Sequence, residues 1–329
     1  METRRPTTPA AEEILGRYFP VLDHGFVALV DYMGSDEDVE RAARVSYGYG
    51  TRRTSETRGL IRYLRRHHHT TPFEMVELKF HCAMPIFVAR QWIRHRTASV
   101  NEYSGRYSLL PLLFYRPDPG LIQMQSASNR QGRDGAPPGA VVEEALARWD
   151  ALRQESAAQY EWLVGHDVAR ELARIDLPLS VYTQWYWKID LHNLLHFLTL
   201  RVDPHAQVEI RAYARVMAGM LARVAPLSFE AWVDYELAGV RLSRVELALL
   251  RRLVHVGDDQ TLRPRDGARP VGQEDMLGAG LSAREIAELV AKLERPPAPA
   301  DFALDPAAAL SAEEFAAHMA AAVPRVDRR

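Results

Sequence analysis

The chain has 329 residues, 47% of them hydrophobic, and a formal net charge of −2. This apolar fraction is enough to bury a core, in one large domain or two smaller ones, while the near-neutral charge argues against a globally basic nucleic-acid-binding protein. The single cysteine, Cys82, excludes an internal disulfide framework and favours a reducing, cytoplasmic compartment. No apolar run reaches the ~18–20 residues of a membrane span, and no segment has the pattern of a signal peptide.

The amino-terminal part of the chain begins with a polar stretch and continues with a strand and helices. We expect residues 1–19 to form a flexible arm, because they start with a polar, proline-containing sequence. Residues 25–33 are apolar and rich in strand-forming side chains, which predicts a β-strand. A helix is predicted over residues 35–46, since Ser35 can cap it and acids in its first turn suit the helix dipole. Apolar residues at helical spacing predict a second helix over residues 55–67.

Strands, helices and loops alternate through the next part of the chain. Residues 75–84 alternate in side-chain character and predict a strand, after which Pro85 suits the first turn of a helix that runs to Arg96. A loop is expected over residues 97–107. A second loop, rich in Gly, Pro, Ser and Asn, is expected on the surface over residues 125–139.

Long helices and an aromatic strand are expected next. Residues 140–174 predict one or two long helices, and the aromatic residues 181–188 predict a strand. Asp190 is a suitable N-cap for a helix over residues 191–201, and another helix is predicted over residues 205–224.

The composition changes after residue 256, and residues 257–280 are rich in Gly, Asp, Arg and Pro. Two short helices follow, each opened by a capping box in which a glutamate lies three residues after a serine. These boxes are Ser282 with Glu285 and Ser311 with Glu314. We therefore divide the chain into the arm, a main domain over residues 20–256 and a helical appendage over residues 257–329.

This mixture of elements predicts an α+β fold with a central mixed or antiparallel sheet flanked by helices. The sequence has no long β–α–β alternation and no Gly-rich phosphate fingerprint. A Rossmann domain is therefore not indicated.

The densest set of polar side chains lies over residues 90–106, which read RQWIRHRTASVNEYSGR. Four arginines and His95 accompany a single acid, Glu102. The planar fork of arginine matches two phosphate oxygens, and a Ser-Gly-Arg loop lets backbone N–H groups approach an anion closely. The segment predicts an anion site for a nucleotide or a phosphorylated cofactor. The alternative is a solvated basic helix end, but Trp92 and Ile93 indicate a partly buried helix, in which arginines need partners.

Three segments together resemble the flavin-dependent thymidylate synthase family. The first is Arg94-His95-Arg96, followed after seven residues by Ser104 within NEYSGRY. The second is the upstream HTTPFEMVELKFHCAMPIFVARQW, and the third is the downstream LPLSVYTQWYWKIDLHNLLHFLTLRVDPHAQVEI. The segments occur in the family's order and at its approximate spacing. The likeness runs from about Val21 to Tyr235, so it makes residues 20–256 the catalytic domain and leaves the tail without a role.

The resemblance implies the fold of that family, assembled as a homotetramer that binds FAD and dUMP where subunits meet. Arg201 would be the catalytic residue, because a fixed cation beside the uracil ring stabilises negative charge that develops on the pyrimidine. The positions assigned to FAD are Ser46, His69, Thr71, Arg94, His95, Arg96, Glu102, Asp190, His192 and His196. The positions assigned to dUMP are Gln91, Trp92, Ile93, Arg94, Glu102, Tyr103, Ser104, Gly105, Arg106, Arg174 and Arg201.

The reaction implied is the reductive methylation of dUMP to dTMP, with 5,10-methylenetetrahydrofolate as one-carbon donor and FAD reduced by NADPH. Neither a nucleic acid nor a membrane is expected as a partner. Three alternatives stay open. They are another flavin or nucleotide enzyme with the same anion site, an RNA- or DNA-binding module that uses the basic segment, and a degenerate family member that binds nucleotide without catalysis.

One position departs from the family pattern. Many members carry Asn-x-Arg before the last flavin helix, whereas this chain has Asp190, Leu191 and His192. Asp190 can cap the helix and accept a hydrogen bond, but it cannot donate one as an amide would. An uncompensated carboxylate near the flavin would also disfavour the anionic reduced form.

Cys82 and the histidines are the remaining candidates for chemistry. Cys82 lies in mid-strand without an activating motif, so we expect a small buried residue and not the thiolate nucleophile of other thymidylate synthases. His192 and His196 lie four residues apart on one helix face, which is metal-ligand spacing. However, Asn193 replaces the Glu of the zinc-protease motif, and no metal is expected. Residues 67–69, three histidines, suit the negative end of a helix dipole.

Overall fold

The protein, described by a computed structural model, forms two compact units. The first comprises residues up to Glu230 together with the segment from Phe302, and the second runs from Ala231 to Asp301. The boundary expected at residue 256 falls inside the second unit. Within the described residues no helix is long and apolar enough to cross a membrane. The described residues are 6–45, 56–127, 132–294 and 302–322.

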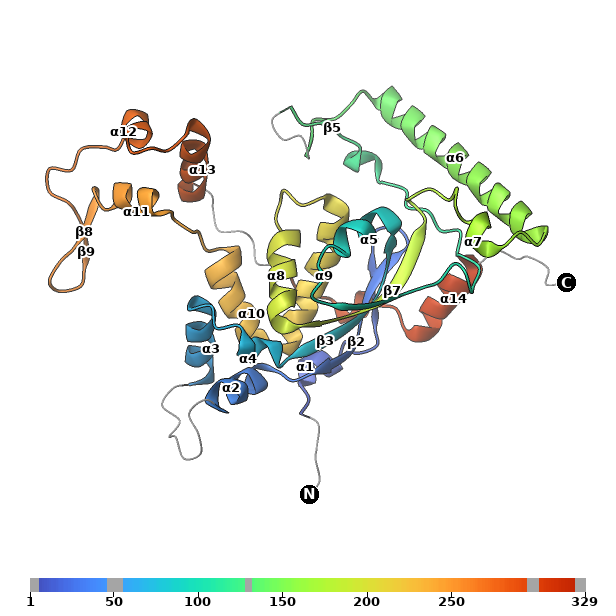
Figure 1. The fold of residues 1–329 in the computed structure, drawn as a ribbon, viewed down its shortest axis with the longest axis horizontal. Coiled ribbons are helices and arrows are strands. Elements are labelled where there is room, and N and C mark those ends of the chain that lie inside the picture. The colour runs from blue at the N-terminus through green and yellow to red at the C-terminus, as the bar shows by residue number, and fades with distance from the viewer. Residues whose placement is uncertain (1–5, 46–55, 128–131, 295–301, 323–329) are drawn as a thin grey trace, which may run out of the picture. The chain divides into compact units, whose positions relative to one another are not determined.

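A five-stranded antiparallel sheet lies at the centre of the first unit, in the order β1-β2-β3-β7-β4 (Figure 1). β3 is the middle strand and pairs along its whole length with β7, so that His81 lies opposite Tyr186. The antiparallel form of the expected sheet and the strands expected over residues 25–33, 75–84 and 181–188 are confirmed, with ends shifted by one or two residues. The strands are β1 (Tyr18–Val21), β2 (Gly25–Met33), β3 (Glu77–Pro85), β4 (Ser99–Glu102) and β7 (Tyr182–Asp190).

Three helices cover one face of this sheet (Figure 1). Trp92 at the end of α5 lies edge-on to Trp185 and to Trp187 on β7, with ring centroids 5.4 Å apart in both cases. Trp92 also stacks on Phe197 of α8 at 5.2 Å. All four rings are buried, so an aromatic core fixes the end of α5 against the sheet. The helices are α5 (Ile86–Trp92), α8 (Leu191–Arg201) and α9 (Val208–Val224).

The carboxy-terminal helix α14 (Ala312–Ala322) packs on the opposite face. Phe315 stacks on Tyr18 of β1 at 4.2 Å between ring centroids and lies edge-on to Phe26 of β2 at 4.4 Å. Two backbone hydrogen bonds of 3.1 and 2.8 Å join Tyr18 to Leu310 just before the helix. The helix predicted after the capping box at Ser311 is therefore confirmed, and it belongs to the first unit.

The other elements of the first unit surround this core. The helices expected over residues 35–46, 55–67 and 140–174 are present within the described ranges, whereas the helix expected to run to Arg96 ends at Trp92. The elements are α1 (Pro9–Glu12), α2 (Asp36–Val45), α3 (Thr57–Arg66), α4 (Thr71–Glu74), the 3-10 turn η1 (Pro119–Leu121), the hairpin strands β5 (Met124–Gln125) and β6 (Arg133–Asp134), α6 (Gly139–Gly165), α7 (Arg170–Ala173) and α10 (Pro226–Trp232).

Two segments differ from the expectation. The described part of the expected arm is packed on the core, because Ala11 and Ile14 are fully buried and the Tyr32 hydroxyl donates a hydrogen bond to Glu12. Residues 97–107, expected as a loop, contain the edge strand β4. All four residues of β4 are exposed, so the strand lacks the alternation of apolar and polar residues that marks a half-buried strand.

The second unit has a small core of its own, in which Leu249, Leu281, Ile286 and Leu289 are buried. The capping box predicted at the start of α13 is confirmed, since the Ser282 N–H donates to Glu285 at 2.8 Å and the Glu285 N–H donates to the Ser282 hydroxyl at 3.3 Å. The elements are the π-helical turn η2 (Val233–Leu237), α11 (Arg244–Leu250), β8 (Val254–Val256), β9 (Leu262–Pro264), α12 (Gln273–Gly278) and α13 (Ala283–Glu294).

Candidate active site

The residues after α5 form an exposed cationic end to that helix. Trp92 is fully buried and leaves no surface for a ligand in this chain, and the chain then turns outward. Ile93, Arg94 and Arg96 are exposed, and neither arginine makes a hydrogen bond or an ion pair with any other residue in the described part of the chain. Two guanidinium groups without neighbouring acids fit the anion site predicted from residues 90–106.

Arg201, the last residue of α8, lies beside this helix end and contacts His95. Its Nε–H donates to His95 Nε2 at 3.0 Å. His95 must therefore be neutral, with its proton on Nδ1. Burial, and next the charges of Arg201 and His196, lower the pKa of His95 to about 4. The neutral imidazole and the buried edge of Phe197, 4.8 Å from it between ring centroids, fix the direction of the Arg201 guanidinium.

The segment from Glu102 to Arg106 forms a second polar group with Arg174. Glu102, at the end of β4, accepts a hydrogen bond of 2.8 Å from the Thr183 hydroxyl. Gly105 is buried, and a Cβ at this position would lie 3.0 Å from Leu110 and 3.2 Å from Arg174, so a glycine is needed for the loop to lie this close. Four polar side chains lie in or beside this loop: Ser104, Arg106, Arg170 and Arg174.

The charges of this second group are only partly satisfied. Arg106 forms an ion pair of 3.1 Å with Glu171, in which both side chains are more than half exposed. Arg174 makes no side-chain hydrogen bond or ion pair within the described residues. Tyr103 is half-buried, and its hydroxyl donates to the Leu109 carbonyl at 2.6 Å. The loop therefore presents one free and one weakly held guanidinium, which suits a phosphate.

The predicted nucleotide residues thus lie in two groups within one chain. The first contains Gln91, Arg94 and Arg201, and the second contains Ser104, Arg106 and Arg174. Across the described residues, no hydrogen bond or ion pair joins the two groups.

Three of the residues assigned to FAD, Thr71, His192 and His196, lie on α4 and α8, which pack against each other. Thr71 is exposed at the start of α4, and His196 is exposed on α8 one turn beyond His192. Burial, and next the charge of Arg65, lower the pKa of His192, whose Nδ1 is buried without a hydrogen-bond partner among the described residues. His69 is exposed after α3, and Ser46 lies outside the described residues.

Asp190 caps α8, as predicted from the sequence. Its carboxylate accepts a hydrogen bond of 2.9 Å from the Asn193 N–H and another of 2.6 Å from the Asn193 side-chain amide. Both carboxylate oxygens are therefore engaged by the same residue. The first turn of α8 compensates the charge that would otherwise lie uncompensated at this position.

Cys82 has the environment of a core residue. It is fully buried in β3, and burial raises the pKa of its thiol well above the ordinary value. The prediction of a small buried strand residue is confirmed, and this environment is unlike that of a nucleophilic cysteine, which needs a lowered pKa and access to substrate. Among the described residues no cluster of three or more His, Cys, Asp or Glu side chains could hold a metal ion.

Comparison with known proteins identifies the family. The model of the thymidylate synthase complementing protein family matches residues 28–227. The flavin-dependent thymidylate synthase of Rickettsia conorii is 50% identical over 266 residues, which cover 77% of this chain and 90% of the relative. That of Gluconobacter oxydans is 50% identical over 298 residues, which cover 89% of this chain and 92% of the relative. The chain belongs to the flavin-dependent thymidylate synthase family.

A solved structure supports the same placement. A UMP/dUMP methylase from Streptomyces cacaoi, bound with 5-Br UMP, matches this enzyme with a TM-score of 0.60 and 33% identity. The match covers 98% of that chain but 66% of this one. The family resemblance predicted from the sequence is therefore confirmed, and the enzyme carries additional chain beyond its structural neighbour.

The structure adds two polar partners that the sequence did not indicate. The Gln91 amide donates a hydrogen bond to the Gln207 side chain, 116 positions away. Thr183 donates to Glu102 across 81 positions. Neither Gln207 nor Thr183 has a motif of its own, and only the pairing of β4 with β7 and the approach of α5 to α9 reveal them.

Proposed function

We propose that this enzyme converts dUMP to dTMP by reductive methylation, with 5,10-methylenetetrahydrofolate as the one-carbon donor and FAD reduced by NADPH. One observation carries the proposal. In a chain of this family, the unpaired Arg94 and Arg96 lie at the same helix end as the hydrogen bond between His95 and Arg201. The likeness to a methylase bound with a uridine nucleotide analogue supports the choice of nucleotide.

The second polar group would hold the phosphate of dUMP. Arg106 and Arg174 can each offer a fork of N–H donors, and charge-assisted bonds to a phosphate are stronger than neutral ones. The close approach at Gly105 keeps the Arg174 side chain beside this loop. Arg106 would exchange its exposed ion pair with Glu171 for the phosphate, at little cost, because surface pairs contribute only ~0–1 kcal/mol.

Arg201 would act at the pyrimidine ring. Its guanidinium is held by a neutral acceptor, His95, and not by an acid, so its full positive charge stays available to substrate. A fixed cation in a partly buried site stabilises negative charge that develops on the ring during methyl transfer. With Cys82 buried and protonated, this electrostatic stabilisation replaces a covalent attack by a thiolate.

The residues on α4 and α8 fit a flavin. The buried Nδ1 of His192 lacks a partner within the described residues and can bond a polar edge, while exposed Thr71 and His196 border the same helix pair. Arg94 and Arg96 can meet the pyrophosphate of FAD. When bound, the flavin would supply the reducing equivalents that complete the methyl group. Asp190 would orient α8 as its cap and would add little repulsion, since Asn193 engages its carboxylate.

We propose a homotetramer in which one chain supplies the Arg94 and Arg201 group and a neighbour supplies the Ser104 and Arg174 group. The lack of any polar link between these groups within the described residues of one chain supports this arrangement. In a shared site, the phosphate-binding Ser104 and Arg174 group of one chain would lie opposite the base-binding Arg94 and Arg201 group of the next.

The test is an absorbance spectrum of the purified enzyme followed by anaerobic addition of NADPH, with and without dUMP. We expect a flavin band that bleaches on NADPH addition, at a rate that changes when dUMP is present. Deoxyuridine, which differs from dUMP only in lacking the phosphate, serves as the control and should leave the rate unchanged. A colourless protein that neither takes up FAD nor responds to dUMP would overturn the proposal.

A further inference from the structure

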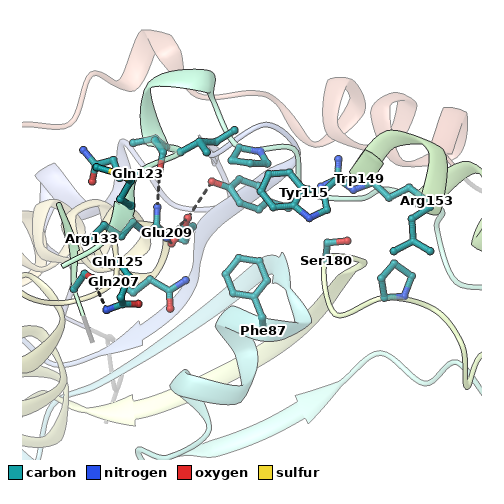
Figure 2. Close-up of a pocket in the computed structure, with 17 residues that line it drawn as sticks. Phe87, Tyr115, Gln123, Gln125, Arg133, Trp149, Arg153, Ser180, Gln207 and Glu209 are labelled. Carbon is teal, nitrogen blue, oxygen red and sulfur yellow. Dashed lines mark hydrogen bonds and ion pairs between the residues drawn. The ribbon is translucent and has the colours of Figure 1, made fainter. Parts of the chain in front are cut away.

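A cavity of about 480 Å³ opens in the first unit between the η1 turn, the β5–β6 hairpin, α6 and the start of α9 (Figure 2). None of the residues assigned above to dUMP or FAD lines it. Its volume lies within the ~300–1,000 Å³ that is typical of small-molecule pockets.

The walls of the cavity are aromatic and aliphatic. Three rings line the cavity: Phe87 from α5, Trp149 from α6, and Tyr115 from the segment before η1. Leu121 and Ile122 add aliphatic surface. Figure 2 shows the Phe87 ring directed toward Tyr115, and their centroids are 5.6 Å apart with the planes inclined by 47°. Flat rings gain most from such walls, because aromatic side chains offer large contact area in offset and edge-on arrangements.

The charges at the cavity are compensated within the fold. Arg133 donates two hydrogen bonds of 2.7 Å to Glu209, whose side chain is 3% exposed, and the Tyr115 hydroxyl donates to the same carboxylate at 3.2 Å. Burial alone would raise the pKa of Glu209, but these bonds and the charge of Arg133 hold it below the ordinary value. Arg153 pairs in turn with Asp150 at 3.0 Å. Among the described residues that line the cavity, no cation is therefore left free for a phosphate or carboxylate.

Two neutral polar side chains remain available in the lining. Gln123 and Ser180 make no side-chain hydrogen bond to any other residue in the described parts of the chain. A carboxamide offers both a donor and an acceptor, and a hydroxyl can act as either. The Gln123 carboxamide and the Ser180 hydroxyl could therefore hydrogen-bond the edge of a heteroaromatic ring that has ring nitrogens and an amide or amino group.

We propose that this cavity binds an uncharged, planar nitrogen heterocycle, of which the nicotinamide, adenine and pterin rings are the candidate sources. Aromatic walls would hold its faces, and Gln123 and Ser180 would bond its edge. The ligand class thus differs from that of the nucleotide site, where free guanidinium groups select phosphate.

The cavity is connected to the proposed nucleotide site through α5. Phe87 and Gln91 lie four residues apart on this helix and therefore share a face. Gln91 bonds to Gln207, which lines the cavity and hydrogen-bonds Glu209. On the proposed function, a ring in the cavity would therefore change the affinity for dUMP. Binding of the ring itself does not depend on that function.

The test is calorimetric titration of the full chain, as purified, with nicotinamide, adenosine or pterin. Two substitutions on exposed positions of α6 form a matched pair. Leu152→Trp would place a bulky ring at the cavity, whereas Ala151→Trp, one position earlier, adds the same ring outside it. Gln123→Ala removes the amide without adding bulk, and Arg94→Ala reports on binding at the nucleotide and flavin site instead.

We expect one probe to bind with a stoichiometry of one per chain, and the identity of that probe gives the source of the ring. Its dissociation constant should rise at least tenfold in Leu152→Trp and roughly two- to tenfold in Gln123→Ala, the loss of one hydrogen bond. Ala151→Trp and Arg94→Ala should leave it unchanged. Three outcomes would overturn the proposal: no binding by any probe, equal binding in the two tryptophan variants, or loss of binding in Arg94→Ala. A change of oligomeric state in Leu152→Trp without probe binding by the wild type would assign the cavity to a second copy of the chain.

Discussion

Arginines at two places in the first unit differ in their electrostatic environment. Arg133 shares two bonds of 2.7 Å with the buried Glu209, so its charge is neutralised inside the fold. Arg94 and Arg96 form no ion pair with any acid in the described chain. A high density of arginines in the sequence therefore does not by itself indicate an anion site. An anion site is indicated by a guanidinium that no buried carboxylate neutralises, whereas Arg133, neutralised by the buried Glu209, stabilises the fold.

Arg133→Ala tests the stabilising member of this comparison and should have the largest effect. Glu209, 3% exposed, would lose the cation that compensates its buried charge. We expect the free energy of unfolding to fall by ~3–5 kcal/mol, the cost of breaking a buried pair. Arg94→Ala is the control and should change it by no more than ~0.5 kcal/mol, since the side chain is exposed and makes no bond. Urea unfolding of both variants gives the answer, and equal losses would remove the distinction.

Arg201→Ala tests an arginine that we expect to act on the bound ligand. The variant should keep its yellow flavin colour but lose turnover by ~10²–10³-fold, as when one preorganised electrostatic donor is removed from an active site. Arg148→Ala, in an exposed pair with Glu144 on α6, is a control that should leave turnover intact. The measurement is kcat together with the flavin spectrum. Wild-type turnover in Arg201→Ala would sink the assigned role.

Arg106→Ala should weaken dUMP binding by roughly 10- to 150-fold, because it removes a charge-assisted hydrogen bond of ~1.5–3 kcal/mol. Glu171→Ala sharpens the comparison in the opposite direction. It frees Arg106 from an exposed ion pair of 3.1 Å, so dUMP should bind equally well or slightly more tightly. Titration of dUMP into the flavin-loaded enzyme measures both constants. Tighter binding in Arg106→Ala, or markedly weaker binding in Glu171→Ala, would contradict the phosphate role.

Much of the sheet and its helices could be predicted from periodicity. Residues 25–33 and 181–188 form strands because their apolar side chains are buried on both faces or on alternate faces. β4 was missed, because an exposed edge strand that pairs only with β7 carries no burial pattern. The packing of Ile14 and Phe315 on the core was missed for another reason: a few apolar residues in a polar segment do not say which surface they will meet.

The candidate site could be predicted as a set of residues but not as a set of contacts. Family resemblance indicated Arg94, Arg106 and Arg201 by position. Their partners are set by tertiary structure, since His95 lies 106 positions from Arg201 and Glu171 has no motif to mark it. The same holds for Asp190, whose capping role was predicted but whose compensation by Asn193 required the helix geometry.

A further expected effect concerns the acid side of the stability profile and His95. Its pKa in the folded enzyme is about 4, because of burial first and the charges of Arg201 and His196 next. In the unfolded chain a histidine titrates near ~6.5. Between these values the unfolded state binds a proton that the folded state does not, so stability falls as the pH is lowered from about 6.5 toward 4 and is unaffected by this group above 6.5.

His95→Gln isolates this contribution. The amide oxygen of glutamine can accept the bond from Arg201 without titrating, so the decline in urea midpoint from pH 6.5 to 4 should be shallower than in the wild type. His95→Ala should also flatten the decline, but without an acceptor it should release Arg201 and lower kcat at neutral pH. Turnover retained in His95→Gln and lost in His95→Ala would separate the positioning of Arg201 from the titration. Identical pH profiles in the wild type and His95→Gln would show that the neutral histidine does not set the acid limit.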